Sequence, residues 1–547
     1  MHGLMMADQL LVTNIMRFAE RNFPDTEIVS VIGGDGVHRC TYAETFSRTR
    51  RLANALRELG VHQGHRVGTL AWNDFRHFEI YYATSCSGAI CHTVNPRLFS
   101  EQIAYIVDHA QDQWIFADPM FAGLLDALWP TLKSPQGVVF LTDAAHVPET
   151  GIPRVHDYES LIAGQQDSFD WPDLDERCAS ALCYTSGTTG HPKGVLYDHR
   201  STIIHAYAAG MPDVLGLANR DSVLAVVPMF HANAWSLPYA CPIVGAKLVL
   251  PGPAMGDPAT LADLLDSESV TATMGVPTVW LGLLAYLRES GRRPGALERM
   301  VVGGAACPRS LMDAFREEYG VNVHHSWGMT EMSPLGVINS PTRSVLALPP
   351  EEQPDIRVKQ GRGVFGVEMR IVDESSHELP WDGVSSGALQ VRGPWVCGQY
   401  FQPDEADPAH LQDGWFDTGD IATIDPFGFM QITDRAKDVI KSGGEWISSI
   451  ELENATMGHP EVVEAAVIAV PHPKWSERPL LLVVSGEGSE LTKDALLLWL
   501  EQKVARWWLP EEVLFIDEIP HTATGKIAKT KLRERYGRHP SPGVSAP

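Results

Sequence analysis

The sequence predicts an α/β protein in which a large N-terminal domain is followed by a small C-terminal α+β domain. From Arg66 onward, short apolar runs alternate with amphipathic stretches of helical length. This pattern is typical of parallel sheets covered on both faces by helices. Beyond about residue 360 the pattern changes to short strands separated by Gly, Pro and Asp. A chain of 547 residues also has room for three or four structural units.

The N-terminal domain is expected to hold two stacked α/β sheets and a β-barrel-like unit. For the first sheet, the predicted elements in order are the strand Arg66–Ala71, the helix Phe75–Ser87, the strand Gly88–His92, the helix Ser100–Ala110 and the strand Gln113–Ala117. The second sheet is predicted from the apolar runs Ser222–Val227, Ala246–Leu250, Thr271–Val276 and Arg299–Val302. The β-barrel-like unit, from about residue 360, is predicted from the strands Glu368–Val372, Gly387–Val391 and Phe429–Thr433.

The C-terminal α+β unit is predicted from two apolar strands and one helix, namely Ala465–Val470, Leu480–Val484 and Thr492–Ala505. We therefore expect an N-terminal domain over 1–434 and a C-terminal domain over 438–547, with residues 435–437 between them. The tail from His539 is rich in Pro, Ser and Gly, so it is predicted to be disordered.

Composition excludes several classes of protein. The net charge of −25 argues against nucleic acid or an anionic membrane as a partner of the whole surface. No apolar stretch approaches the roughly 20 residues that span a bilayer, and the N-terminus lacks the basic and apolar regions of a signal peptide. The eight cysteines show no metal or redox spacing. We expect a soluble, cytoplasmic protein with reduced, mostly buried thiols.

The sharpest motif is an eleven-residue string, Tyr184 to Gly194, that follows the apolar run Ala179–Cys183. Its glycines let the backbone approach a ligand, its hydroxyls can bond phosphate oxygens, and its lysine supplies a positive charge. It differs from a P-loop, which needs four residues between its glycines and a Gly-Lys-Ser/Thr ending. The predicted phosphate-binding residues are Thr185, Ser186, Gly187, Thr188, Thr189, Gly190 and Lys193.

This string resembles the phosphate-binding loop of the superfamily that includes acyl-CoA synthetases, firefly luciferase and nonribosomal peptide adenylation domains. Further family motifs follow in the expected order over almost the whole chain. The resemblance implies an adenine-binding turn at Gly303, Gly304, Ala305 and Ala306, an adenylate- and Mg²⁺-binding segment at Ser326, Trp327, Gly328, Met329, Thr330 and Glu331, and nucleotide contacts from Asp420, Ile432 and Arg435. Within the superfamily, the chain is most similar to bacterial medium-chain fatty-acid ligases and 3-methylmercaptopropionate ligases.

The chemistry of the charged residues agrees with these roles. Glu331 is a hard oxygen ligand suited to Mg²⁺, with Thr188 as the second expected ligand. Asp420 can accept hydrogen bonds from two ribose hydroxyls, and Arg435 adds donors beside it. Gly525-Lys526 resembles the catalytic lysine loop of the family. The resemblance implies that Lys526 brings a cation to the acyl carboxylate and the phosphate, where negative charge must be stabilised.

The resemblance also implies a second half-reaction. Residues 435–437 resemble the family's hinge, with Lys437 at the hinge position, which implies a mobile C-terminal domain. The following segment resembles the one that lines the tunnel for the pantetheine arm of coenzyme A. That segment gives Lys441 as a third catalytic residue beside Lys526 and Glu331, with coenzyme A contacts from Ser442, Gly443, Gly444, Glu445 and Trp446. A plain hairpin turn is the alternative for the glycine pair. The basic residues Lys529, Lys531, Arg533 and Arg535 are either near the coenzyme A phosphates or on a solvated helix face.

Residues that match the family's acyl pocket are His231, Trp235, Gly275, Val276 and Trp327. Adenylation domains for amino acids usually carry an Asp where this chain has Phe230-His231, so an uncharged acid is favoured. Two indoles in the pocket would shorten it, since each fills about 150 to 250 Å² of contact surface. Short or medium chains are therefore expected, and a core position for Trp235 is the alternative.

These observations predict an AMP-forming acid–thiol ligase that uses ATP, Mg²⁺ and coenzyme A. The acid, which 3-methylmercaptopropionate would fit, is activated as acyl-AMP and then transferred to the thiol. One alternative is an enzyme that loads a carrier protein or uses the adenylate in another reaction, and a regulatory protein without chemistry is a third reading. Expected partners are these small molecules, with no nucleic acid or membrane span, and a homodimer is left open.

Overall fold

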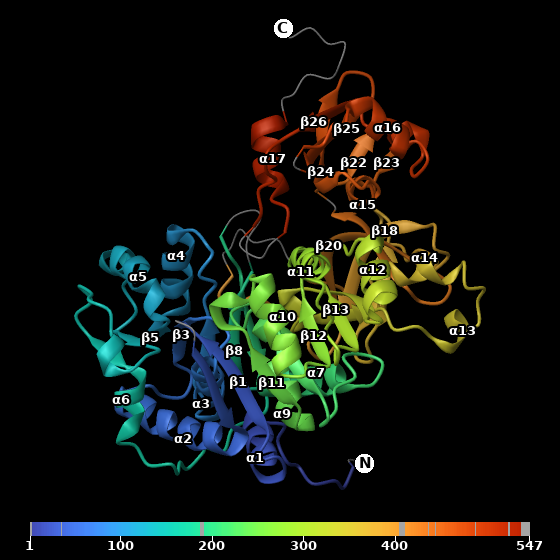
Figure 1. The fold of residues 1–547 in the computed structure, drawn as a ribbon. Helices are drawn as coiled ribbons and strands as arrows, with labels where there is room; N and C mark the ends of the chain where they lie inside the picture. The colour runs from blue at the N-terminus through green and yellow to red at the C-terminus, as the bar shows by residue number, and fades with distance from the viewer. Residues whose placement is uncertain are drawn as a thin grey trace.

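The computed structural model describes residues 3–33, 36–185, 191–403, 411–435, 437–442, 445–486, 488–522 and 526–537. Within these residues the strands form four sheets, and the sheet near the C-terminus belongs to a smaller unit that Figure 1 shows above the rest of the molecule. The predicted disordered tail from His539 lies outside the described residues. No helix in the described segments is long and apolar enough to cross a membrane.

One large sheet follows the second predicted alternation but also takes in the N-terminal hairpin. Its central strands are parallel, and β1 joins β11 in parallel while pairing with β2 in antiparallel. In spatial order the strands are β16 (Arg362–Gly363), β15 (Leu335–Ile338), β14 (Asn322–Gly328), β13 (Arg299–Val302), β12 (Ala272–Gly275), β10 (Ser222–Ala225), β11 (Lys247–Leu250), β1 (Glu27–Ile32) and β2 (Gly36–Thr41).

The other large sheet is parallel except for the antiparallel pair β8 and β9. That pair matters for function because it carries the predicted phosphate loop between its strands. In spatial order the strands are β7 (Val155–Asp157), β6 (Val138–Phe140), β5 (Asp112–Ala117), β3 (Arg66–Leu70), β4 (Ile90–Thr93), β8 (Ala179–Tyr184) and β9 (Gly194–Asp198).

Three groups of helices cover the faces of the two large sheets. One layer shares a single hydrophobic core with inward-facing residues of both sheets and comprises α1 (Val12–Asn22), α2 (Tyr42–Glu58), α3 (Phe75–Cys86), α7 (His199–Gly210) and α9 (Leu237–Val244). The outer face of the first sheet is covered by α10 (Pro258–Ser267), α11 (Pro277–Ser290) and α12 (Arg309–Tyr319). The outer face of the second is covered by α4 (Ser100–Ala110) and α5 (Ala122–Leu128).

Local sequence explains where these helices begin. Thr41 and Glu44 form a reciprocal capping box at the start of α2, with Thr41 N donating to Glu44 Oε2 at 2.8 Å. Asp74 accepts the backbone N–H of His77 at 2.8 Å and so caps α3. The remaining short helices are α6 (Tyr158–Ala163), α8 (Ala232–Trp235), α13 (Arg343–Leu346), α14 (Gln353–Arg357) and the 3-10 turns Pro119–Phe121, Trp129–Thr131, Ala144–His146, Gly252–Ala254, Thr330–Met332 and Arg506–Trp508.

The β-rich unit is an antiparallel sheet, and the C-terminal unit has its own sheet and core. The first consists of β17 (Glu368–Val372), β18 (Ser386–Arg392), β19 (Leu411–Gln412), β20 (Trp415–Ile424) and β21 (Met430–Arg435). The second consists of β22 (Ile440–Ser442), β23 (Glu445–Ile447), β24 (Val462–His472), β25 (Ser476–Ser485) and β26 (Glu512–Phe515), with α15 (Ser449–Met457), α16 (Lys493–Leu500) and α17 (Lys529–Tyr536).

One predicted helix is shorter than expected. The sequence predicts a helix over Thr492–Ala505, whereas α16 ends at Leu500. The three residues that follow, 501–503, are exposed and offer no apolar side chain to the core. The predicted thiols are free, as all eight cysteines lie within the described residues without a disulfide, and all but Cys178 and Cys397 are buried.

Candidate active site

The predicted phosphate-binding loop connects two strands rather than a strand and a helix. Tyr184 of β8 lies opposite Gly194 of β9. Thr185 N donates to Lys193 O at 2.9 Å, and Lys193 N donates to Thr185 Oγ1 at 3.2 Å. Both ends of the loop are therefore fixed at the base of a hairpin. The other predicted loop residues, Ser186, Gly187, Thr188, Thr189 and Gly190, lie outside the described residues.

Helix α4 supports this loop through two aromatic residues that sequence reasoning missed. The Tyr184 hydroxyl lies 2.7 Å from His109 Nδ1, and Nε2 of the same imidazole lies 3.1 Å from the backbone oxygen of Gln402. One turn earlier on the helix, Tyr105 stacks on His191 with ring centroids 4.3 Å apart. The i, i+4 spacing of Tyr105 and His109 was the available signal, since such residues share one helix face.

The predicted adenine-binding turn follows β13 and packs against the predicted acyl pocket. Gly304 has φ +81°, a left-handed conformation that favours glycine. A side chain at Gly303 would meet Ser326 Oγ at 2.6 Å and the Trp235 ring at 3.0 Å, so only glycine fits there. The turn, continued by Ala305 and Ala306, therefore lies between the nucleotide-binding and acyl-binding candidates.

A bond network joins the first large sheet to the β-rich unit. Trp327, at the end of β14, donates its indole N–H to Asp420 Oδ2 at 2.9 Å. Arg435 Nε lies 2.8 Å from Asp420 Oδ1, because Asp420 on β20 and Arg435 on β21 face each other in register. Ile432, also on β21, donates its N–H to Gln360 at 2.8 Å. Asp420 is only 3% exposed, so the Trp327 and Arg435 donors stabilise a buried carboxylate.

Lys526 enters this network from the C-terminal unit. It is partly buried, and burial together with the charge of Arg435 lowers its pKa to about 8, against the opposing attraction of Asp420 and Glu331. Burial and the nearby Lys526 charge lower the pKa of His231 to about 4, so this imidazole is neutral at pH 7. The structure thus brings together catalytic, nucleotide-binding and acyl-pocket candidates from three separate units of the chain.

Glu331 is the candidate metal ligand. It lies in the 3-10 turn Thr330–Met332, is 7% exposed, and accepts a hydrogen bond from the Tyr400 hydroxyl at 2.6 Å. No cluster of three or more His, Cys, Asp or Glu side chains that could hold a metal occurs among the described residues. A single carboxylate fits Mg²⁺ that takes its other ligands from ATP phosphates and water. The neighbouring Met329 and Thr330 are fixed through their backbone, by Pro334 and Tyr197 respectively.

The acyl-pocket candidates His231 and Trp235 flank an unusual turn. Every residue from Ala232 to Ser236 has a positive φ, between 42° and 72°, which is a left-handed helical turn made without glycine. Such a conformation is costly for residues with side chains. It is held by Asn233, whose amide oxygen accepts from the Tyr81 hydroxyl at 3.1 Å and from Cys183 at 3.4 Å.

The pocket candidates Gly275 and Val276 come from a different element, the end of β12. A side chain at Gly275 would meet the Trp280 ring at 2.6 Å. Val276 approaches the adenine-binding turn, since its Cγ1 would lie 3.2 Å from a Cβ at Gly304. These two residues therefore border the same region as Trp235.

The coenzyme A candidates lie away from these contacts. Lys441 N donates to Glu477 at 2.8 Å, and Ser442 accepts from Arg478 at 3.3 Å, so both are bonded within the C-terminal sheet. Ser442 pairs with Glu445 in register, and the intervening Gly443 and Gly444 lie outside the described residues, as do the side chains of Glu445 and Trp446. Burial lowers the pKa of Lys437 at the predicted hinge.

Two of the late basic residues form internal ion pairs. Lys529 Nζ lies 2.7 Å from Glu453, and Arg533 lies 2.6 Å from Asp438. Lys531 is placed with its ammonium 5.3 Å from the Phe99 ring centroid. The internal pairing of Lys529 and Arg533 favours a structural role over a phosphate contact for these two residues.

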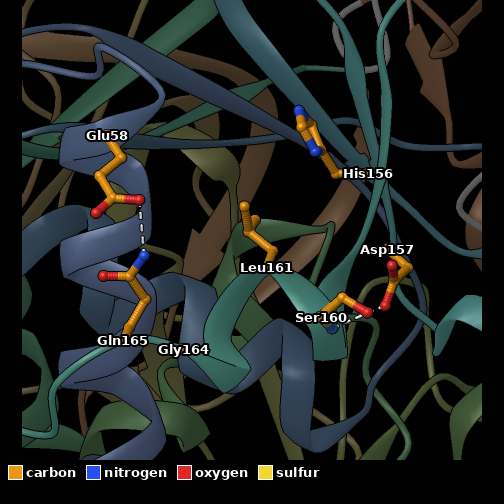
Figure 2. Close-up of a pocket in the computed structure, with 7 residues that line it drawn as sticks. All are labelled: Glu58, His156, Asp157, Ser160, Leu161, Gly164 and Gln165. Carbon is orange, nitrogen blue, oxygen red and sulfur yellow. Dashed lines mark hydrogen bonds between the residues drawn. The ribbon is translucent and has the colours of Figure 1, made fainter.

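A separate surface hollow between α2 and α6 contains none of the predicted site residues. Figure 2 shows its lining, in which Gln165 donates to Glu58 at 2.8 Å and Asp157 caps α6 by accepting the Ser160 N–H at 2.8 Å. The polar groups named here bond to one another, so the hollow gives no indication of a second site.

Comparison with known families decides the relationship. The model of the AMP-binding enzyme family matches residues 16–401, and that of the AMP-binding enzyme C-terminal domain matches residues 451–526. The chain belongs to the AMP-binding enzyme family. The resemblance inferred from the motifs is thereby confirmed.

Similar family members include three curated ligases. A 3-methylmercaptopropionyl-CoA ligase of Ruegeria lacuscaerulensis is 50% identical over 98% of this chain and 99% of its own. A medium-chain-fatty-acid–CoA ligase of Ectopseudomonas oleovorans is 48% identical over 98% of each chain. A long-chain-fatty-acid–CoA ligase of Thermus thermophilus is 46% identical over 97% of this chain and 96% of its own.

Solved structures in the family share the fold. An anthranilate CoA ligase in complex with anthranoyl-AMP superposes with a TM-score of 0.85 at 25% identity, covering 95% of this chain and 96% of that one. ATP-bound MatB from Rhodopseudomonas palustris gives 0.80 at 25% identity, covering 96% and 99%. The predicted α/β fold class, with a separate smaller C-terminal unit, is confirmed.

Proposed function

We propose that the chain is an ATP-dependent acyl-CoA synthetase that activates a short- or medium-chain carboxylic acid as acyl-AMP and transfers the acyl group to coenzyme A. The observation that carries the proposal is the convergence of Lys526 with Asp420, Arg435 and Glu331. Lys526, from the C-terminal unit, lies near enough to two buried carboxylates for their charges to act on its amine. Of these, Asp420 is suited to ribose and Glu331 to Mg²⁺.

In the first half-reaction, a carboxylate oxygen of the acid attacks the α-phosphorus of ATP and pyrophosphate leaves. Lys526 holds its ammonium where negative charge builds between the carboxylate and the phosphate. Lys193 and the loop from Thr185 to Gly190 bind the departing phosphates, and Asp420 fixes the ribose. When bound through Glu331 and Thr188, Mg²⁺ supplies charge neutralisation to the phosphates.

In the second half-reaction, the thiol of coenzyme A attacks the acyl carbonyl, the acyl–phosphate bond breaks, and AMP leaves. We assign Lys437 as the pivot about which the C-terminal unit, residues 438–547, turns between the two steps. That motion would withdraw Lys526 and bring Lys441 with the segment from Ser442 to Trp446 to the acyl group. The exposure of Lys441 in the present arrangement supports this assignment.

The acid itself is assigned as uncharged beyond its carboxylate. His231 is neutral at pH 7 because of its lowered pKa, and a charged acyl chain would have no described counter-ion at the positions of Trp235, Gly275 and Val276. The relatives named for 3-methylmercaptopropionate and for medium-chain fatty acids are 50% and 48% identical, against 46% for the relative named for long-chain fatty acids. We therefore assign the substrate to the short and medium aliphatic or thioether acids.

A panel of acids tests the proposal. Pyrophosphate release should require a short or medium acid and proceed once without coenzyme A, while multiple turnovers should require it. Lys526→Ala should slow adenylation by about 10²- to 10³-fold yet convert synthetic acyl-adenylate normally. Gly444→Leu should do the opposite. Pyrophosphate release that is indifferent to coenzyme A, or turnover with a carrier protein instead, would refute the assignment.

A further inference from the structure

Tyr400 lies between two parts of the proposed ATP site that are far apart in the sequence. Its hydroxyl donates to Glu331 Oε1 at 2.6 Å. Its ring carries the ammonium of Lys193 at 5.1 Å from the centroid, within the range of a cation–π interaction. The edge of Phe416 on β20 packs against the same ring, with centroids 6.4 Å apart. One side chain thus contacts both the phosphate-loop lysine and the candidate metal ligand.

The backbone on either side of Tyr400 is fixed to the same two parts. Cys397 N donates to the backbone oxygen of Glu331 at 2.7 Å, and Phe401 N donates to Gly194 O at 2.8 Å. Two residues before Cys397, the buried Trp395 donates its indole N–H to Leu335 O at 3.0 Å. The segment from Trp395 to Phe401 is therefore held at both ends, and this restricts where the Tyr400 ring can lie.

We propose that Tyr400 is a positioning residue for metal-bound ATP. Its hydroxyl fixes one oxygen of the nearly buried Glu331 carboxylate, so that the other oxygen is available to a cation. Its ring face holds the Lys193 ammonium beside the phosphate loop. The inference rests on the proposed function, because it assigns Glu331 and Lys193 to the same nucleotide.

Two substitutions separate the hydroxyl from the ring. Tyr400→Phe keeps the ring under Lys193 and removes the bond to Glu331, whereas Tyr400→Leu removes both. Tyr158→Phe is the matched control, because Tyr158 makes the same kind of bond, at 2.5 Å, to Glu79 elsewhere in the molecule. All variants are made in the full chain, and thermal unfolding checks that they are folded.

The readout is binding rather than turnover. Mn²⁺ affinity is measured by electron paramagnetic resonance with a non-hydrolysable ATP analogue present, and affinity for the analogue alone is measured by calorimetry in EDTA. Tyr400→Phe should weaken Mn²⁺ binding by about tenfold, as for other residues that orient a metal ligand, and leave metal-free analogue binding unchanged. Tyr400→Leu should weaken both. The control should weaken neither.

Wild-type Mn²⁺ affinity in Tyr400→Phe would overturn the proposal, and so would an equal loss in the Tyr158→Phe control. An equal loss of metal-free analogue binding in Tyr400→Phe would do the same. If Tyr400→Leu does not fold, the Phe variant decides alone. Failure of the proposed function is distinct: wild-type protein would then bind metal and analogue but release no pyrophosphate with any acid.

Discussion

Raising the pH should switch off adenylation because Lys526 loses its proton. Burial and Arg435 lower the pKa of this amine to about 8. The charged form is therefore present below pH 8 and lost above it. At pH 7 about 90% of the free enzyme carries the ammonium and at pH 9 about 10%, so kcat/KM for adenylation should fall by roughly tenfold between them.

The assay is ATP–pyrophosphate exchange at subsaturating ATP and acid, without coenzyme A. Omitting the thiol removes its own titration, and kcat/KM reports groups of the free enzyme. Lys526→Arg supplies the control, because a guanidinium keeps its charge across this range. The rate of this variant is expected to be lower, because the guanidinium does not place its charge where the ammonium does. Its kcat/KM should nevertheless stay constant from pH 7 to 9.

Two results would refute this reasoning. A wild-type profile that stays level up to pH 9.5 would mean that the Lys526 charge is not required in the free enzyme. If kcat/KM of Lys526→Arg also fell at high pH with the same midpoint as the wild type, the titrating group would be another residue.

Three further predictions concern the pocket and the C-terminal unit. Trp235→Ala should move preference toward longer or bulkier acids and cost about 1 to 3 kcal/mol for a small acid, measured as kcat/KM over a chain-length series. Asn233→Ala should destabilise the protein by about 1 to 3 kcal/mol in denaturant unfolding, because it releases the left-handed turn. Lys529→Met should cost about 3 to 5 kcal/mol by the same measurement, because Glu453 would stay buried without its cation.

Strands and helices that bury one apolar face could be predicted closely from the sequence. The helix Ser100–Ala110 and the strand Arg299–Val302 have the predicted bounds. The hairpin of β1 and β2 was not anticipated, because its place depends on pairing with β11 more than 200 residues later. The local sequence pattern carries no information about a strand partner that distant. Each correctly predicted strand or helix, in contrast, shows its own apolar periodicity.

The charged candidate residues could be proposed from the sequence because their types and motifs are distinctive, but the residues that contact them in the structure could not. Tyr400 and His109 act through a hydroxyl and an imidazole that have no motif of their own. The left-handed turn at Asn233 contains no glycine, the residue from which such a turn could be predicted. For Lys529 the sequence left two interpretations, a contact to the coenzyme A phosphates or a solvated helix face. The structure places its ammonium in a largely buried ion pair with Glu453, which neither interpretation included.

The last prediction concerns the contacts that a turning C-terminal unit must break. Asp434, fully buried at the end of β21, accepts from Ser449 N at 2.7 Å and from Ser449 Oγ at 3.0 Å across the proposed pivot. The ion pairs Lys529–Glu453 and Arg533–Asp438 lie on the far side of Lys437 and would travel with the unit. The charges of Lys526 and Lys529 also attract Asp420 and Asp434 across the same pivot, so the Asp434 bonds are one of several interactions that favour the adenylation arrangement.

Asp434→Asn should weaken these bonds while keeping the shape of the side chain. Hydrogen bonds to a charged group contribute about 1.5 to 3 kcal/mol each. The amide keeps one acceptor and loses the other, so adenylation should fall by at most roughly 10- to 150-fold. Thioester formation from synthetic acyl-adenylate should be unchanged or faster, because that step uses the other arrangement. Stopped-flow measurement of both half-reactions decides. Equal slowing of the two would show that Asp434 supports the fold in general and does not select between two orientations.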